Sequence, residues 1–215
     1  MPFTKFDPQI HGFHFGNSFT NHLIFDIETH GLCGGMAFAS LDYFHAGLPA
    51  PTHEGPDFPD GKVPPEGSAL RNYIYGRMVD TLVANAGTWL RVVAGPVFNP
   101  VRFTRNRIPG LLRAIDDGQP VPLGLIGSLS VRNAGAGNHQ VVCFGYEKSA
   151  DGKKLTLHIY DNNAPDRTRT LETDPTDPET ITYSSGQKWL GFFMEDYKRK
   201  SPVYRDLRLS TGIAI

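Results

Sequence analysis

The stretch that decides the fold is GLCGGMAFASLDYFHAG, residues 31–47. Its apolar residues recur at spacings of three and four, the pattern of one face of a helix: Cys33, Met36, Ala37, Leu41 and Phe44. Gly47 and Pro49 follow, and both residue types favour the end of a helix. The pattern therefore predicts a buried helix over about 33–45, with Cys33 at its beginning.

Glycine and proline separate this helix from its neighbours. Residues 1–30 show no helical period, and we expect an irregular segment there with a short strand near 23–26. Six prolines within 47–67 predict a long ordered loop. Apolar residues on one stripe predict two further helices, over about 67–86 and about 104–117.

The second half of the chain changes to the shorter period of β-strands. Short apolar, β-branched and aromatic runs predict strands over 121–126, 139–146, 155–160, 180–183 and 189–194. The second and third runs are separated by Asp151-Gly152, a strong hairpin signal. The sequence therefore predicts an α+β fold, with N-terminal helices packed on a C-terminal antiparallel β-sheet in a single domain over 1–215.

Composition and charge exclude several classes of protein. The 215 residues are 40% apolar and 20% charged, which is typical of a globular chain and not of a disordered one. The net charge is −1 and the 21 lysines and arginines are scattered, so nucleic acid is not an expected partner. No apolar run approaches about 18 residues, and the first residues do not resemble a signal peptide. We therefore expect a soluble protein with no membrane contact, cytoplasmic or released without a signal peptide, whose oligomeric state the sequence does not indicate.

Cys33 has the position of a reactive thiol. A helix N-terminus carries unpaired N–H groups and the positive end of the helix dipole, and both favour the nucleophilic thiolate form of a cysteine. Gly34 and Gly35 carry no side chain, which we expect to let a substrate backbone approach the sulfur. The N–H groups of this turn, that of Gly34 included, are candidates to hold a developing oxyanion.

His139 and Asp161 complete a candidate catalytic group. His139 begins one predicted strand, and Asp161 follows the end of the next. Pairing across Asp151-Gly152 places His139 opposite about residue 164, within a few residues of Asp161 and Asn162. An imidazole and an orienting carboxylate can therefore meet beside a thiol, as activated nucleophiles require.

Other cysteine and histidine residues have plainer interpretations. Two cysteines are too few for a disulfide framework or a cysteine-rich zinc site, although a single bridge between Cys33 and Cys143 is left open. Cys143 lies among apolar residues about 13 Å along the strand from His139, and we interpret it as a core residue. His11 and His14 have the spacing of a ligand pair, but no acidic pattern accompanies them. We therefore expect neither a metal nor another cofactor.

The three blocks together resemble the papain-like cysteine peptidase fold, and within it the C39-like group. They are GLCGGMA at 31–37, NHQVVCFGYE at 138–147 and IYDNNAP at 159–165. The resemblance implies a papain-like α+β fold in which Cys33 is the nucleophile, His139 the general base and acid, and Asp161 the residue that orients the imidazole. Because papain itself uses asparagine as the orienter, Asn162 is an alternative to Asp161.

The chain departs from the family at the oxyanion hole. The family usually has glutamine about six residues before the cysteine, whereas Ile27 stands there in this chain. Asn17 is our candidate for the missing amide donor. The resulting prediction is a cysteine hydrolase that cleaves a peptide or amide bond through a thioester. An acyltransferase with the same triad and a binding module that keeps the fold without turnover are the alternatives.

Overall fold

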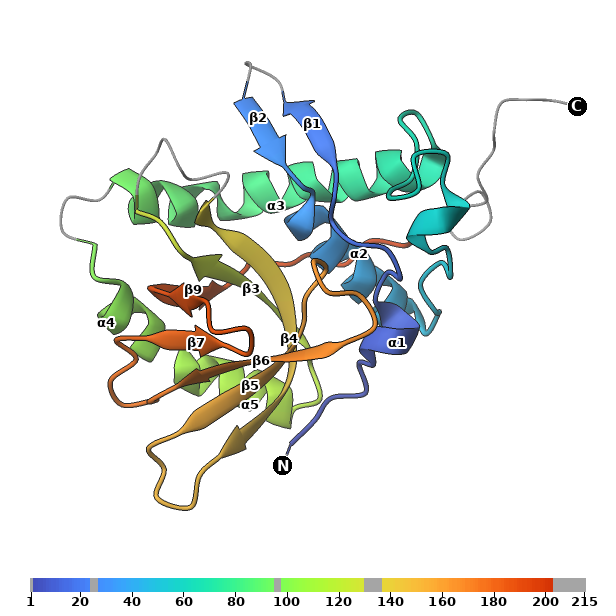
Figure 1. The fold of residues 1–215 in the computed structure, drawn as a ribbon. Coiled ribbons are helices and arrows are strands. Elements are labelled where there is room, and N and C mark those ends of the chain that lie inside the picture. The colour runs from blue at the N-terminus through green and yellow to red at the C-terminus, as the bar shows by residue number, and fades with distance from the viewer. Residues whose placement is uncertain (1, 24–26, 95–97, 130–136, 203–215) are drawn as a thin grey trace, which may run out of the picture.

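The protein has an α+β architecture in the computed structural model, which describes residues 2–23, 27–94, 98–129 and 137–202. The first half contains α1 (Pro8–His11), β1 (Thr20–Leu23), β2 (Ile27–His30), α2 (Cys33–Ala46), η1 (Gly55–Asp57), α3 (Ala69–Ala94), α4 (Pro100–Arg105) and α5 (Ile108–Asp116). The second half contains β3 (Val121–Ile126), β4 (His139–Lys148), β5 (Leu155–Tyr160), β6 (Thr168–Thr173), β7 (Ile181–Tyr183), β8 (Lys188–Trp189) and β9 (Gly191–Met194). Helices α2 and α3 pack together beside the curled sheet (Figure 1). None of the described helices is long and apolar enough to span a membrane.

The sheet is antiparallel throughout and has the strand order β8-β7-β6-β5-β4-β3-β9. Strands β8 and β9 form its two opposite edges, yet only Leu190 separates them in the chain. The sheet must therefore curl until its edges approach each other, and the Leu190 N–H donates to the Ile126 carbonyl of β3, 2.7 Å away. This curvature brings Trp189 of β8 beside the first residue of β4.

The hairpin of β4 and β5 has the expected pairing. Tyr160 lies opposite Val142 and Leu155 opposite Lys148, with a bulge between Cys143 and Gly145. The loop between the strands is closed by hydrogen bonds between Ser149 and Lys154. Asp161 therefore follows β5 close to the point where β4 begins.

Several element boundaries differ from the sequence predictions. The helix expected over 33–45 is present and ends one residue later, where Gly47 takes a left-handed φ of 68°. The helix expected over 67–86 is instead α3, which continues to Ala94. The helix expected over 104–117 is present as α5, which begins four residues later, at Ile108, and the separate short helix α4 precedes it. Pro109 lacks an N–H, but the first turn of a helix does not use that group, so proline is tolerated in the first turn of α5.

The strand predictions were incomplete in three places. The run 189–194 forms two strands, β8 and β9, and not one. Strand β6 was missed, because TRTLET is mostly polar and only Leu171 and Thr173 are buried in it. The strand expected near 23–26 falls partly on residues 24–26, which lie outside the described residues, and β1 and β2 flank them as an antiparallel pair.

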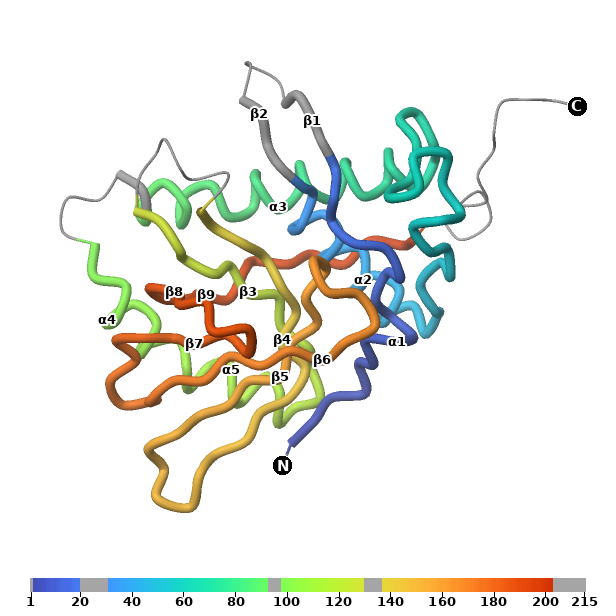
Figure 2. Tube along the Cα trace, viewed as in Figure 1, coloured from blue at the N-terminus to red at the C-terminus, as the bar shows by residue number. Residues whose placement is uncertain are grey.

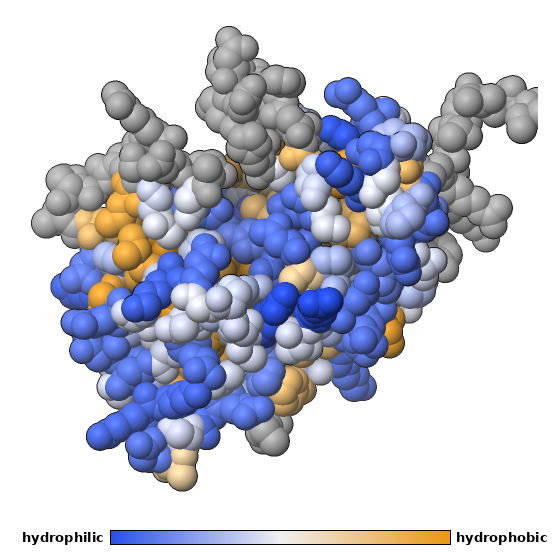
Figure 3. Space-filling view, in the orientation of Figure 1, coloured by the Kyte–Doolittle hydropathy of each residue, from blue (hydrophilic) through white to orange (hydrophobic). Residues whose placement is uncertain are grey.

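Strand β4 contributes to two cores because its alternate side chains point to opposite faces. His139, Val141 and Cys143 share one face, and the latter two pack with α5 and the neighbouring strands. Val142 and Phe144 face α2, where they pack with Ala37 and Leu41. A third cluster joins α2, α3 and the N-terminal segment around Phe15, Met36 and Ile74. The surface on the side drawn in Figure 3 is mostly hydrophilic, with hydrophobic area toward its left edge.

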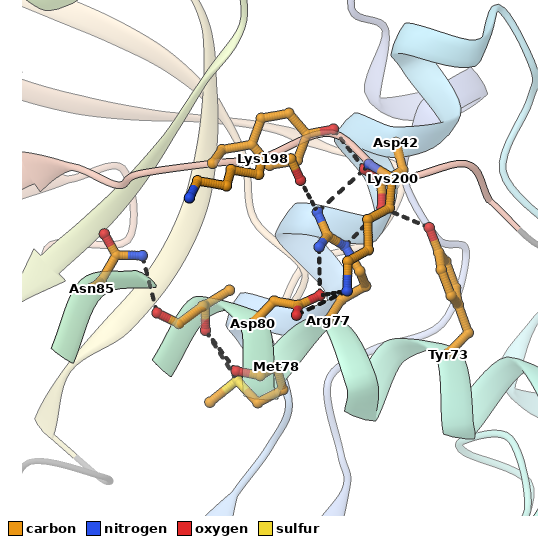
Figure 4. A network of polar contacts seen from close by, with 10 residues as sticks. Asp42, Tyr73, Arg77, Met78, Asp80, Asn85, Lys198 and Lys200 are labelled. Carbon is orange, nitrogen blue, oxygen red and sulfur yellow. Dashed lines mark hydrogen bonds and ion pairs between the residues drawn. The ribbon is translucent and has the colours of Figure 1, made fainter. Parts of the chain in front are cut away.

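Residues 195–202, here called the C-terminal strap, run from β9 back along α3 toward α2 (Figure 2). Asp42 of α2 and Arg77 of α3 hold the strap in place (Figure 4). The Asp42 carboxylate pairs with Arg77 and accepts from Tyr73, Tyr197 and the Lys200 N–H. Arg77 also donates to the Lys198 carbonyl and pairs with Asp80. The Arg77 and Asp42 side chains are only 2% and 0% exposed, so each charge depends on the other for compensation.

We predict that Arg77→Met lowers the free energy of unfolding by about 3–5 kcal/mol, because Asp42 would remain buried without its cation. Urea unfolding measures this change. Lys154→Gln is the control, because the Lys154–Glu172 pair is exposed and its loss is expected to cost less than about 1 kcal/mol. Equal losses in the two variants would contradict the prediction.

Candidate active site

Cys33 is the first residue of α2 and is partly exposed. The preceding residue, Leu32, offers no side-chain cap to the helix. The first N–H groups of a helix have no acceptor within it, so those of Cys33 and Gly34 are not used by the helix that begins at Cys33. Gly31 provides the turn into the helix with a φ of 92°, a conformation that favours glycine.

His139 and Asp161 form a buried hydrogen-bonded pair. The imidazole Nε2 donates to Asp161 Oδ1 over 2.8 Å, and both side chains are less than 10% exposed. The same carboxylate accepts from the Tyr183 hydroxyl and from the Asn163 N–H. Because Nε2 is taken by Asp161, Nδ1 is the ring nitrogen that remains for Cys33.

The environment of this pair favours its charged form. Burial would lower the pKa of His139, but hydrogen bonds and charge interactions with Asp161 and Cys33 outweigh burial and raise that pKa above its ordinary 6.5. Burial opposes ionisation of Asp161 as well, yet His139, Tyr183 and the Asn163 N–H together lower its pKa. Near neutral pH the pair is therefore an imidazolium and a carboxylate.

Trp189 covers the imidazole. Its ring is stacked on that of His139, with 6.2 Å between centroids and 20° between planes. The ring arrives there because the sheet curls until β8 approaches the beginning of β4. It shields the His139–Asp161 pair from water, which strengthens the interaction between them.

Asp161, and not Asn162, contacts the imidazole. Asn162 is fully buried, and its Nδ2 donates to the Cys33 carbonyl at 3.0 Å and to the Gln140 carbonyl at 3.1 Å. Asn162 therefore joins the beginning of α2 to the beginning of β4. The alternative in which Asn162 orients His139 does not fit this geometry, since the amide is occupied by two backbone carbonyls.

The interpretation of Gly34 and Gly35 as room for a substrate is wrong. A Cβ atom on Gly34 would lie 2.2 Å from the side-chain oxygen of Gln140, and one on Gly35 would lie 2.1 Å from the Ile74 carbonyl of α3. The missing side chains therefore admit the Gln140 amide and the α3 backbone, not a ligand. The backbone N–H of Gly34 keeps its candidate role as an oxyanion donor.

Asn17 lies against the turn that precedes Cys33. Its Oδ1 accepts from the Leu32 N–H, and its own backbone N–H donates to the Asn162 carbonyl. A Cβ on Gly31 would lie 2.3 Å from Asn17 Nδ2, so the amide is packed closely beside this turn. With Oδ1 engaged, Nδ2 is the end of the side chain that can donate to an oxyanion.

The remaining cysteine and histidine candidates lie elsewhere. Cys143 is fully buried in the sheet core, where burial raises the pKa of its thiol to about 12, and neither cysteine is in a disulfide. His11 contacts Asp7, and His14 contacts Asp166. Within the described residues, no group of three or more His, Cys, Asp or Glu side chains is arranged to hold a metal ion.

Four residues of the site were missed by sequence reasoning: Gln140, Tyr183, Trp189 and Glu195. Gln140 and Glu195 are hydrogen-bonded to each other, and Gln140 also contacts Cys33. One available signal was the polarity of Gln140 at the beginning of an apolar strand, and another was Glu195 directly after the buried run of β9. Tyr183 and Trp189 carried no such signal, because aromatic residues are ordinary in strands.

No known protein family matches this chain, and no curated protein or solved structure is detectably similar to it.

We predict that iodoacetamide alkylates Cys33 at pH 6 at least tenfold faster than it alkylates free cysteine. The positive charge of an imidazolium at His139 attracts the negative charge that the neighbouring sulfur carries when it attacks, and free cysteine has no such neighbour. Mass spectrometry of the Cys33 peptide gives the rate, and the buried Cys143 is the internal control that stays unlabelled until the protein is denatured. His139→Ala is expected to remove the acceleration. A wild-type rate equal to that of free cysteine would contradict this prediction.

Proposed function

We propose that this protein is a cysteine-dependent hydrolase that cleaves a peptide or amide bond. The observation that carries the proposal is the juxtaposition of a thiol at a helix N-terminus with a buried imidazole–carboxylate pair. The pattern of nucleophile, base and orienting carboxylate is that of an activated nucleophile. The resemblance of three sequence blocks to papain-like peptidases, closest to the C39-like group, supports the same reaction class.

In the proposed reaction, the Cys33 thiolate attacks the carbonyl carbon of the scissile bond, and the carbonyl electrons move to the oxygen. The backbone N–H groups of Cys33 and Gly34 and the Asn17 amide are the donors available to that oxyanion. When the tetrahedral intermediate collapses, the C–N bond breaks and His139 gives its Nδ1 proton to the departing amine. The acyl group remains on the sulfur as a thioester.

The second half of the reaction releases the acyl group. Neutral His139 accepts a proton from water as that water attacks the thioester, and the acid leaves as the thiolate–imidazolium pair is restored. Asp161 holds the imidazole orientation and stabilises its charged form throughout. An amine in place of water would give acyl transfer by the same steps.

The first test is acylation by a small activated ester. Incubation with p-nitrophenyl acetate is expected to place an acetyl group on Cys33, detected by mass spectrometry after acid quenching, and fluorescein-labelled casein probes peptide cleavage. Cys33→Ala is the matched control. If the ester is hydrolysed equally by both proteins and no acetyl group is found on Cys33, the proposed function is wrong.

Asp161→Asn is expected to lower turnover of the ester by about 10²–10⁴-fold, because the amide keeps the shape of the side chain but does not stabilise the imidazolium. Asp166→Asn is the matched control, since it makes the same change at an exposed carboxylate that contacts His14. We expect the control to stay within about twofold of wild type, as is usual for a change remote from the reacting groups. Equal activities of the two variants would assign Asp161 no role in the reaction.

Asn17→Ala separates oxyanion stabilisation from thiol reactivity. An oxyanion forms during acylation by an ester but not during alkylation by iodoacetamide. The rate of acylation is therefore expected to fall by about 10²–10³-fold while the rate of alkylation stays near wild type. A proportional fall in both rates would show that Asn17 supports the turn before Cys33 and does not act on the oxyanion.

A further inference from the structure

Gln140 reaches the reaction centre from the other side of β4. It directly follows His139, so its side chain points to the opposite face of the strand, toward α2. Its Oε1 accepts from Cys33 Sγ at 3.5 Å, and its Nε2 donates to Glu195 Oε1 at 2.6 Å. The side chains of Gln140 and Glu195 belong to residues only 4% and 6% exposed. The amide is thus a buried connection between the thiol and a carboxyl group.

Glu195 is the first residue of the C-terminal strap, and within the described part of the chain only one of its oxygens is hydrogen-bonded. Among the described residues, Oε2 is buried and has no hydrogen-bond partner. A buried carboxylate with one donor for two oxygens is costly, whereas a protonated carboxyl group is not. Consistent with this arrangement, burial raises the pKa of Glu195 to about 7, against the lowering effect of the Gln140 hydrogen bond.

The state of Glu195 restricts how the amide can face the thiol. An ionised carboxylate only accepts hydrogen bonds, so it takes the Nε2 end of Gln140 and leaves Oε1 toward the sulfur. That carbonyl oxygen accepts from a thiol but repels a thiolate. A protonated Glu195 has a hydroxyl to donate, and the amide can then turn so that Oε1 accepts from it and Nε2 donates to the sulfur.

We propose that Gln140 is a fourth residue of the reaction centre, which donates an N–H to the Cys33 thiolate, and that Glu195 is a positioning residue that sets which end of the Gln140 amide faces the sulfur. The inference rests on the proposed function, in which Cys33 reacts as a thiolate. It adds a control of that thiolate that is independent of the His139–Asp161 pair. The sulfur is then held most readily as the thiolate when Glu195 carries a proton.

The groups that surround Gln140 and Glu195 come from the site, from β3 and from α3. On the site side, Cys33 and His139 are the titratable groups that flank Gln140. From β3 the strap meets the Pro122 carbonyl, which accepts the Glu195 N–H, and from α3 it meets the neutral Asn85, which accepts the Asp196 N–H. The charged groups Asp42, Arg77 and Asp80 contact the strap farther along, at residues 197–200.

The experiment compares Cys33 alkylation by iodoacetamide in the full-length wild type and in Glu195→Gln between pH 5.5 and 8.5. Glutamine at this position neither ionises nor restricts the Gln140 amide to one orientation. The ratio of the variant rate to the wild-type rate is expected to be near one at pH 5.5. It is expected to rise about tenfold or more at pH 8.5, the effect of a hydrogen bond to a charged group. Glu172→Gln, an exposed carboxylate in β6, is the control whose ratio stays near one at every pH.

A double-mutant cycle separates the amide from the bare charge of Glu195. In a Gln140→Met background the effect of Glu195→Gln is expected to lose its pH dependence, because methionine has no amide group whose orientation Glu195 could set. A ratio that rises equally with and without Gln140 would assign the effect to charge alone and overturn the proposal. A ratio that stays flat in the presence of Gln140 would overturn it as well.

A second measurement needs no substitution at Gln140. In ¹⁵N spectra of the wild type, its side-chain amide resonances are expected to shift with a midpoint near pH 7, and this titration is expected to be absent from Glu195→Gln. Unshifted resonances would overturn the proposal even where a variant fails to fold. Failure of the proposed function is distinguishable, since it appears as a Cys33 that is no more reactive than free cysteine while the amide still titrates.

Discussion

The side-chain amide of Asn162 holds the beginning of α2 against the beginning of β4. One N–H₂ group donates to the carbonyls of Cys33 and Gln140, which lie far apart in the chain. The bond to Gln140 is buried and the bond to Cys33 is partly buried, and both come from a side chain that is itself fully buried. The distance between nucleophile and base depends on this contact, because Cys33 moves with α2 and His139 with β4. Asn162 lies directly after Asp161, so the turn that orients the imidazole also sets the spacing between the two layers.

The curvature of the sheet is the second condition for the site. It carries Trp189 over His139 and Tyr183 to Asp161, so residues from late strands enclose a pair built by β4 and β5. The strap that follows β9 places Glu195 against Gln140 on the other face of β4. It then continues to the Asp42–Arg77 pair. The thiol is therefore flanked by groups from both halves of the chain, and the helical layer and the sheet cannot separate without dismantling the site.

The sequence predicted those parts of the fold and the site that depend on local signals. The period of residues 33–45, the Asp151-Gly152 turn and the apolar run of β4 determine a helix, a hairpin and a register, and these suffice to bring His139 to Asp161. Tertiary contacts decided the rest. Strand β6 is mostly polar, and pairing with β5 and β7 holds it in the sheet. Its own apolar content therefore gave no signal of a strand. The space beside Gly34 was predicted to admit a substrate, whereas the Gln140 side chain fills it. Gln140 is far from Cys33 in the sequence, so no local pattern indicates this contact.

Two buried acids act on the same thiol from opposite faces of β4, and their environments drive them to opposite states. Asp161 has three donors, one of them a cation, and their combined effect keeps it ionised against the cost of burial. Among the described residues, Glu195 has one neutral donor and one oxygen without a partner, so burial prevails and raises the pKa of Glu195 to about 7. A carboxylate at Asp161 favours the imidazolium, and a carboxyl group at Glu195 frees the Gln140 amide to face the sulfur with its donor end. Both states stabilise the thiolate. They occur together only where the pH is high enough to ionise Asp161 and low enough to keep Glu195 protonated.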